Sequence, residues 1–146
     1  MHWLDNWLWG LPLIVVTVLG HTFALFAMRN RMVTVLARYY DDNNVRILFV
    51  LAMGFAVLLV TALLAVEAAL WGAVYIALGA ASDPAHAMLF SLEALTTFGH
   101  ADVYLAAQWQ FLGALEALNG VILIGLSTAF IYSLLRGAEL RQKELR

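Results

Sequence analysis

This chain of 146 residues contains no cysteine, only two prolines, and charged residues at only 12% of its positions. The absence of cysteine excludes disulfide bonds and thiolate metal sites. A soluble domain carries about 25% charged and about 45–50% apolar residues, whereas 64% of this chain is hydrophobic. The composition therefore predicts an integral membrane protein.

Three long apolar stretches are candidates for membrane-spanning helices, which need about 20 residues each. The first is 10–28, the second is 47–81 with Glu67 as its one charge, and the third is 111–135 with Glu116 as its one charge. The segment between the second and third stretches is mixed in polarity. It is too short for a further crossing with its loops.

The second stretch has the composition of either one long helix or a hairpin of two short ones. As one helix, its 35 residues would measure about 53 Å, well beyond a hydrocarbon core of about 30 Å. All eight Lys and Arg residues lie in 29–46 and 136–146, and a single crossing puts both segments on one side, as the positive-inside rule expects of the cytoplasm. We therefore expect one long helix.

This topology predicts a multi-pass protein of the cell (inner) membrane, with its N-terminus outside and its C-terminus in the cytoplasm. The aromatic side chains of Trp71 and Tyr75, on the second span, would then lie in the outer membrane interface. The interfacial anchors of the first span would be Trp3, Trp7 and Trp9.

The segment between the second and third spans begins with a helix start signal. Asp83 is suited to the N-cap position and Pro84 to the first helical position. From there 85–95 is typical of a helix of about three turns, which a segment with two threonines and a glycine ends. A short helix followed by an extended return to the same face predicts a re-entrant loop. Non-helical backbone at membrane depth requires that protein bury it or that it line a water-filled cavity.

The sequence SLEALTTFGHAD, residues 91–102, resembles the pore helix and selectivity filter of tetrameric potassium channels, whose filter motif is TVGYG. The resemblance implies a filter formed by Thr96, Thr97, Phe98, Gly99, His100 and Ala101, with permeant cations bound at Thr97, Phe98 and Gly99. Asp102 follows the filter, and Glu93 lies where some small bacterial potassium channels carry a glutamate bonded to that aspartate. We expect these two carboxyl groups to support the filter by sharing a proton, the alternative being two separately solvated carboxylates.

The resemblance covers about residues 47–135 and implies an all-α integral membrane fold that assembles as a homotetramer around a central pore. It divides this region into an outer helix (47–81), a pore helix and filter (84–102) and an inner helix (110–135). Gly120 and Gly125 would form the hinge of the inner helix. Outside the resemblance lie 1–46, an extra membrane helix with a basic cytoplasmic connection, and 136–146, a short cytoplasmic tail.

Three filter positions depart from the family. Ala101 replaces the second glycine, and an alanine that needs a positive φ costs on the order of 1 kcal/mol per subunit. Phe98 replaces valine and would have to pack against the pore helix beside Phe90 and Leu95. His100 replaces the tyrosine that braces the filter. We therefore expect passive conduction of a monovalent cation, K⁺ or Na⁺, with reduced potassium selectivity, and neither a cofactor nor enzyme activity.

Two other classes of function stay open. One is a non-conducting structural or accessory membrane protein that retains the channel fold. The other is a transporter or membrane enzyme that uses Glu67 and Glu116, which either act within the membrane or sit in water near the outer interface. Asn119 either faces the cavity or bonds another helix, and His21 is expected to bond another helix rather than a ligand.

No zinc motif, Ser-His-Asp order or basic nucleic-acid patch occurs in the sequence. The expected partners are further copies of this chain and the lipid bilayer, and nucleic acid is not among them.

Overall fold

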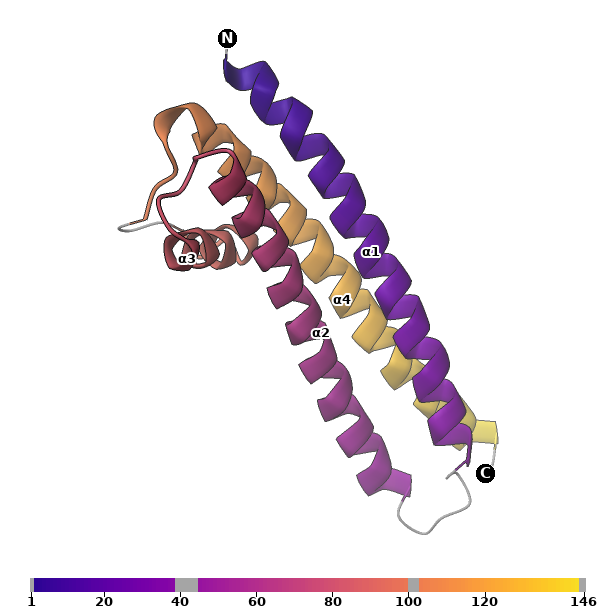
Figure 1. Ribbon diagram of the computed structural model, residues 1–146. Helices are drawn as coiled ribbons and strands as arrows, with labels where there is room; N and C mark the ends of the chain where they lie inside the picture. Colours follow the sequence, from indigo (N-terminus) through magenta and orange to yellow (C-terminus); the bar gives the residue numbers. More distant parts are fainter. Residues whose placement is uncertain (1, 39–44, 100–102, 145–146) are drawn as a thin grey trace.

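The computed structural model describes residues 2–38, 45–99 and 103–144, and all the regular structure in these residues is helical (Figure 1). The elements are α1 (His2–Arg38), α2 (Val45–Ala77), α3 (Pro84–Leu95), the 3₁₀ turn η1 (Ala107–Trp109) and α4 (Gln110–Glu144). Three of these helices are long and apolar enough to cross a membrane, within Trp3–Met32, Ile47–Ala77 and Ala107–Gly137. The composition-based prediction of a multi-pass membrane protein is thereby confirmed.

The second apolar stretch forms one uninterrupted helix, as predicted, and ends at Ala77 rather than at residue 81. Gly79 explains the earlier end, because its φ of 64° is a left-handed conformation that glycine adopts without a Cβ penalty. The amides of Gly79 and Ala80 bond to the carbonyls of Ile76 and Tyr75 at 3.0 and 2.8 Å. This pair of bonds is a Schellman motif, which closes the helix and turns the chain towards α3.

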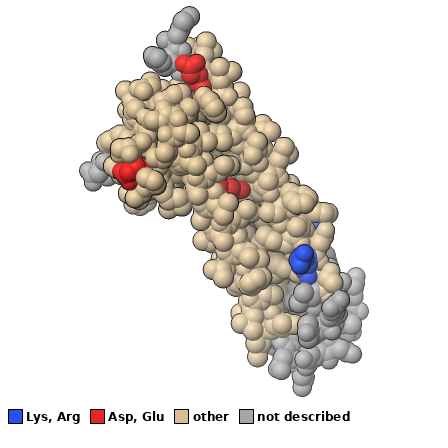
Figure 2. All heavy atoms as spheres, in the orientation of Figure 1, with Lys and Arg blue, Asp and Glu red and all other residues tan. Residues whose placement is uncertain are grey.

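The end of α1, the start of α2 and the end of α4 lie together at one end of the bundle (Figure 1). The chain's N-terminus and α3 lie at the other end. The space-filling view shows described Lys and Arg side chains only towards the first of these ends, whereas Asp and Glu side chains appear singly over the rest of the visible face (Figure 2). A single crossing by α2 thus brings the two basic segments to the same end of the molecule, as the charge pattern predicts.

Helix α1 packs along α4 through one face of buried side chains. These residues recur at helical spacing and are Asn6, Gly10, Thr17, His21, Leu25 and Met32. Near the basic end, Leu25 and Met32 join Ala56 of α2 and Phe130 of α4 in one apolar cluster. The outward face of α1 is apolar as well, with Phe23 75% exposed. Such an outer surface suits lipid rather than water.

Helix α3 begins as predicted. The Asp83 side chain accepts a hydrogen bond from the amide of His86 at 3.0 Å, and Pro84 is the first helical residue. The bond from this amide lowers the pKa of Asp83 below its ordinary value. The cap and the proline fix where the helix starts, and therefore which of its side chains face α2 and α4.

Glycines let α3 approach both neighbouring helices closely. A Cβ at Gly72 of α2 would meet the backbone of Ala87, and one at Gly113 of α4 would lie 2.6 Å from the ring of Phe90. Phe90 also stacks edge-on against Tyr75, with the ring centroids 5.5 Å apart. This packing places α3 against both helices, with its last residue, Leu95, next to Gly120 of α4.

Candidate functional site

The segment that follows α3 leaves the helix at Thr96, as its sequence predicts. Thr97 has a φ of 56° and Gly99 a φ of 94°, so two residues with left-handed backbone alternate with Phe98. For threonine this conformation costs roughly 1–2 kcal/mol. The amides of Thr97 and Phe98 bond back to the carbonyls of Ala94 and Glu93 at 3.0 and 2.9 Å. These bonds over-determine the turn and hold Thr97 in its unfavourable conformation.

Phe98 does not pack against α3 as expected. Its side chain is 82% exposed, whereas Phe90 and Leu95 are buried. The places beside α3 are already filled, since Phe90 contacts Tyr75 and Leu95 belongs to a cluster with helices α2 and α4. The expectation that Phe98 packs against the pore helix beside Phe90 and Leu95 is therefore wrong for the single chain. The predicted filter residues His100 and Ala101, and Asp102 beside them, lie outside the described residues.

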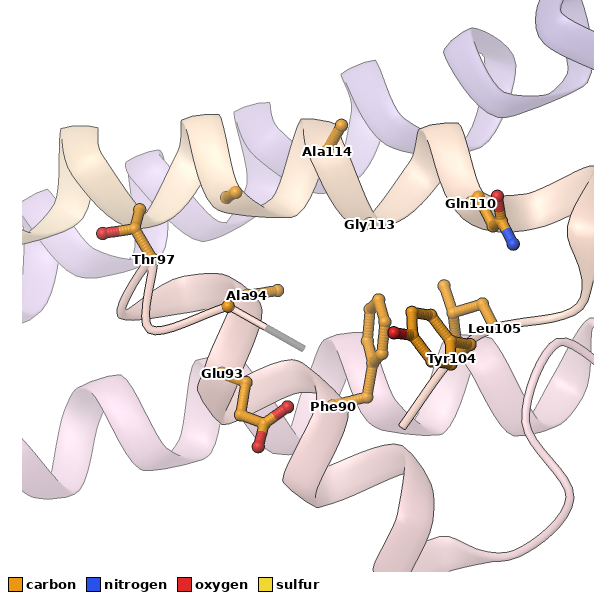
Figure 3. Close-up of a pocket in the computed structure, with 11 residues that line it drawn as sticks. Phe90, Glu93, Ala94, Thr97, Tyr104, Leu105, Gln110, Gly113 and Ala114 are labelled. Atoms are coloured by element: carbon orange, nitrogen blue, oxygen red, sulfur yellow. The ribbon is translucent and has the colours of Figure 1, made fainter. Parts of the chain in front are cut away.

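A cavity of about 450 Å³ lies between α3, the segment after it and the start of α4 (Figure 3). Three residues assigned to the filter and its support, Glu93, Thr97 and Gly99, line it together with Tyr104 and Gln110. The α4 side of the cavity is built from small residues, which are Gly113, Ala114 and Ala117. The structure thus brings these three predicted site residues around one hollow.

The two predicted hinge glycines of α4 differ in their surroundings. A Cβ at Gly120 would collide with the backbone carbonyl of Leu95, the last residue of α3, whereas one at Gly125 would meet nothing within 4 Å. The helix runs without interruption through both positions. Gly120 therefore serves as the contact point for the end of α3 on α4, and the hinge role of the two glycines stays a prediction.

A buried carboxyl group joins α2, α3 and α4 behind the cavity. The Tyr75 hydroxyl donates to Glu116 at 2.5 Å, and the Ser91 hydroxyl contacts both Glu116 and the Ala68 carbonyl, the latter at 2.7 Å. Glu116 is fully buried, which excludes the alternative that it sits in water at the interface. Ser91 is a partner of Glu116 that the sequence did not reveal, because the two residues lie 25 positions apart.

Trp71 and Tyr75 are not the exposed interfacial side chains that the topology suggested. Both are fully buried in the chain. The reason is that Tyr75 finds a hydrogen-bond acceptor inside the bundle, in Glu116. Trp71 packs beside Tyr75, and its indole nitrogen has no partner among the described residues. Of the predicted anchors of α1, Trp3 and Trp9 are exposed, and Trp7 packs against Phe111.

A second buried group joins α1 to α2 and α4. His21 Nδ1 lies 2.9 and 3.1 Å from the two carboxylate oxygens of Glu67, and its Nε2 lies 2.9 Å from the Ser127 hydroxyl. His21 is fully buried and Glu67 is 5% exposed. The prediction that His21 bonds other helices is confirmed. The alternative that Glu67 sits in water near the outer interface is excluded.

Two amides complete the attachment of α1 to α4. Asn119 donates to the Thr17 hydroxyl at 2.8 Å, which confirms the helix-to-helix alternative for this residue. Asn6 donates to the carbonyl of Gln108 and accepts from the amide of Leu112, at 2.9 and 2.8 Å. The amide of Leu112 lies in the first turn of α4 and has no acceptor within its own helix. Asn6 thus caps α4 from another helix.

Comparisons with protein-family models, with curated proteins and with solved structures find no match to this chain. Its function must therefore be argued from these groups and from the surfaces around them.

The atoms of Ser127, His21 and Glu67 follow the order of a nucleophile, a base and an orienting acid. Acyl transfer also needs donors aimed at a developing oxyanion, and the backbone amides around Ser127 belong to the continuous helix α4. Ser127 is 5% exposed, which closes it to a substrate. This arrangement supports a bond between helices rather than a nucleophile.

In the described residues, no three His, Asp or Glu side chains gather as a candidate metal site.

Proposed function

We propose that this protein is the pore-forming subunit of a tetrameric cation channel of the potassium-channel type, in which α3 is the pore helix and residues 96–101 form a divergent filter. Residues 47–135 supply the outer helix, pore loop and inner helix of each subunit. Permeant K⁺ or Na⁺ would bind at Thr97, Phe98 and Gly99, with Glu93 and Asp102 supporting the loop. The N-terminus would lie outside and the C-terminus in the cytoplasm of the cell (inner) membrane.

The observation that carries this proposal is the depth at which α3 ends. Leu95 contacts Gly120, which lies 13 residues into the apolar segment Ala107–Gly137. At 1.5 Å per residue, Gly120 lies about 20 Å from the start and about 26 Å from the end of this 31-residue segment. When the segment is centred on a hydrocarbon core of about 30 Å, Gly120 is therefore near the middle of the core. Non-helical backbone at that depth requires either covering protein or a water-filled cavity.

The residues that leave α3 at this depth are exposed in the single chain. Thr96, Thr97, Phe98 and Gly99 all lie on its surface, with left-handed backbone at two of them. Lipid cannot satisfy the peptide groups of this segment that do not bond back to α3, so further subunits and a water path between them account best for the exposure. A closed ring of identical subunits supplies both, and four is the number that the filter resemblance implies.

One observation favours a second candidate. Phe98 presents a large apolar side chain at the place where the ion path would run, and it is 82% exposed. An assembly with four such rings near its axis suits a non-conducting structural or accessory protein that retains the channel fold. The two candidates share a tetramer and differ in conduction.

The deciding experiment is cation flux into liposomes that hold the purified protein, measured for K⁺, Na⁺ and larger ions at several pH values. The channel proposal expects flux above that of empty liposomes. Flux equal to empty liposomes for every ion and pH would refute conduction, and a tetramer by native mass spectrometry would then favour the accessory protein.

A combined variant tests whether residues 96–101 set the selectivity. Restoring the family pattern with Phe98→Val, His100→Tyr and Ala101→Gly should raise the ratio of K⁺ to Na⁺ flux. The matched control is Leu8→Val, a substitution on the exposed face of α1, which should leave the ratio unchanged. An unchanged ratio in the combined variant would show that the filter lies elsewhere.

A further inference from the structure

The contacts around Glu116 allow a count of protons. Three oxygen-to-oxygen contacts connect the Ala68 carbonyl, the Ser91 hydroxyl, the Glu116 carboxyl and the Tyr75 hydroxyl in a chain. Each contact needs one proton, because two oxygens without a proton between them repel each other at hydrogen-bonding distance. Ser91 and Tyr75 supply one proton each. An ionised Glu116 supplies none, so three contacts would share two protons.

The positions of the protons follow from the chemistry of each group. The Ala68 carbonyl only accepts, so the single proton of Ser91 belongs to that 2.7 Å contact. The contact between Ser91 and Glu116 Oε1 then takes its proton from the carboxyl group. The remaining oxygen, Oε2, accepts from the Tyr75 hydroxyl at 2.5 Å. When Glu116 is protonated, each of the three contacts is a hydrogen bond. When Glu116 is ionised, the contact between Ser91 and Oε1 has no proton and is lost.

The contact between Ser91 and Glu116 is direct, and Glu116, Ser91 and Tyr75 are all 0% exposed, so bulk solvent does not reach these three contacts. The titratable group that α2 presents to Glu116 is Tyr75, and the polar group that α3 presents is Ser91. The His residues of the neighbouring elements are paired elsewhere: His86 of α3 with Asp83, and His21 of α1 with Glu67. On its α4-facing side α1 also presents Asn6 and Thr17, which are uncharged.

We propose that Glu116 is a proton-binding site within each subunit, and that its bound proton fastens α3 to α2 and α4. The Glu116 side chain reaches Ser91 only as a donor, so loss of the proton breaks this side-chain bond between α4 and α3. The short helix and the segment at Thr97 then lose their polar attachment to the inner helix. This site goes beyond the proposed channel function, because it requires neither conduction nor four subunits.

Infrared spectroscopy tests the site directly in the purified wild-type protein. A protonated carboxylic acid gives a C=O stretching band that carboxylates lack and that shifts in D₂O. We expect this band at neutral pH in the wild type, and its loss or reduction by one carboxyl group in Glu116→Gln. The matched control is Asp83→Asn, which removes an exposed carboxylate whose pKa is lowered and should leave the band intact. A band equal in wild type and Glu116→Gln, or no band in the wild type, would overturn the proposal.

Unfolding gives an independent measurement. If the folded chain holds a proton that the unfolded chain releases, stability falls as pH rises, with at most about a tenfold change in the unfolding equilibrium constant per pH unit. The amide of Glu116→Gln donates to Ser91 and accepts from Tyr75, so this variant should fold with near wild-type stability and lose that pH dependence. Glu116→Leu, which does neither, should be less stable. Failure of Glu116→Gln to fold, or a pH dependence equal to that of the wild type, would contradict a protonated Glu116. These readouts do not involve flux and are separable from a failure of the channel proposal.

Discussion

Replacement of Gly120 by alanine tests the packing that places α3 in the molecule. The new Cβ would collide with the carbonyl oxygen, carbonyl carbon and Cα of Leu95, which are backbone atoms and cannot rotate away. Either the end of α3 or the middle of α4 must move. Gly125 offers a matched control one and a half turns further along the same helix, because a Cβ there would meet nothing within 4 Å.

The two substitutions are expected to change the free energy of unfolding in opposite directions. Overpacking in a close-packed interior costs about 1–3 kcal/mol, while replacing glycine by alanine within a helix gains about 0.5–1 kcal/mol. For Gly120→Ala the collision involves backbone, so we expect the upper part of that range and a net loss of roughly 1–2 kcal/mol. For Gly125→Ala only the gain of about 0.5–1 kcal/mol applies.

The assay is reversible unfolding in mixed detergent micelles, with helix content as the signal and both variants measured beside the wild type. Gly120→Ala should unfold at a lower concentration of denaturing detergent than the wild type, and Gly125→Ala at an equal or higher one. If the two variants behave alike, the close approach of Leu95 to α4 is not present in the folded protein. The end of α3 would then not lie at the depth of Gly120.

Two further predictions concern buried and capping polar groups. Asp83→Ala should lower the thermal midpoint, while Asp83→Asn should keep the cap and remove its pH dependence. Folding lowers the pKa of Asp83. The stability that its ionised carboxylate contributes is therefore present above the pKa of the unfolded chain, about 3.9, and is lost as pH falls through the lower pKa of the folded chain. Melting curves between about pH 6 and about pH 3 measure this loss. His21→Ala should cost about 3–5 kcal/mol by leaving Glu67 buried without its partner. The double variant His21→Ala, Glu67→Ala should recover part of that loss, and a double variant no more stable than His21→Ala would show that Glu67 is not destabilised by the loss of its partner.

The helices of this protein could be predicted because their signals are local. Apolar length located the three long helices, and the distribution of basic residues decided that 47–81 is one helix rather than a hairpin. The start of α3 followed from Asp83 and Pro84, which act within one turn. Apolar composition overstates the length of α2 by four residues, because it does not show that Gly79 ends the helix in a Schellman motif.

The buried polar groups could not be paired from the sequence, because their partners are distant in the chain. His21 meets Glu67 46 residues later and Ser127 106 residues later. A signal for the face of α1 was present, since Asn6, Thr17 and His21 are separated by 11 and 4 residues and therefore lie on one side of a helix. The exposure of Phe98 was missed for a similar reason, as the space beside α3 is filled by α2 and α4.

The attachment of α1 to α4 has a consequence for the synthesis of the chain. The α4 partners of Asn6, Thr17 and His21 lie 102 to 106 residues downstream of them. At about 5–20 residues per second, the first helix waits roughly 5–20 s in the membrane before those partners emerge from the ribosome. During that interval its polar face has no α4 to bind. An insertase or a membrane chaperone would thus have the most to protect at the stage when the first helix is already inserted and α4 has not yet been made.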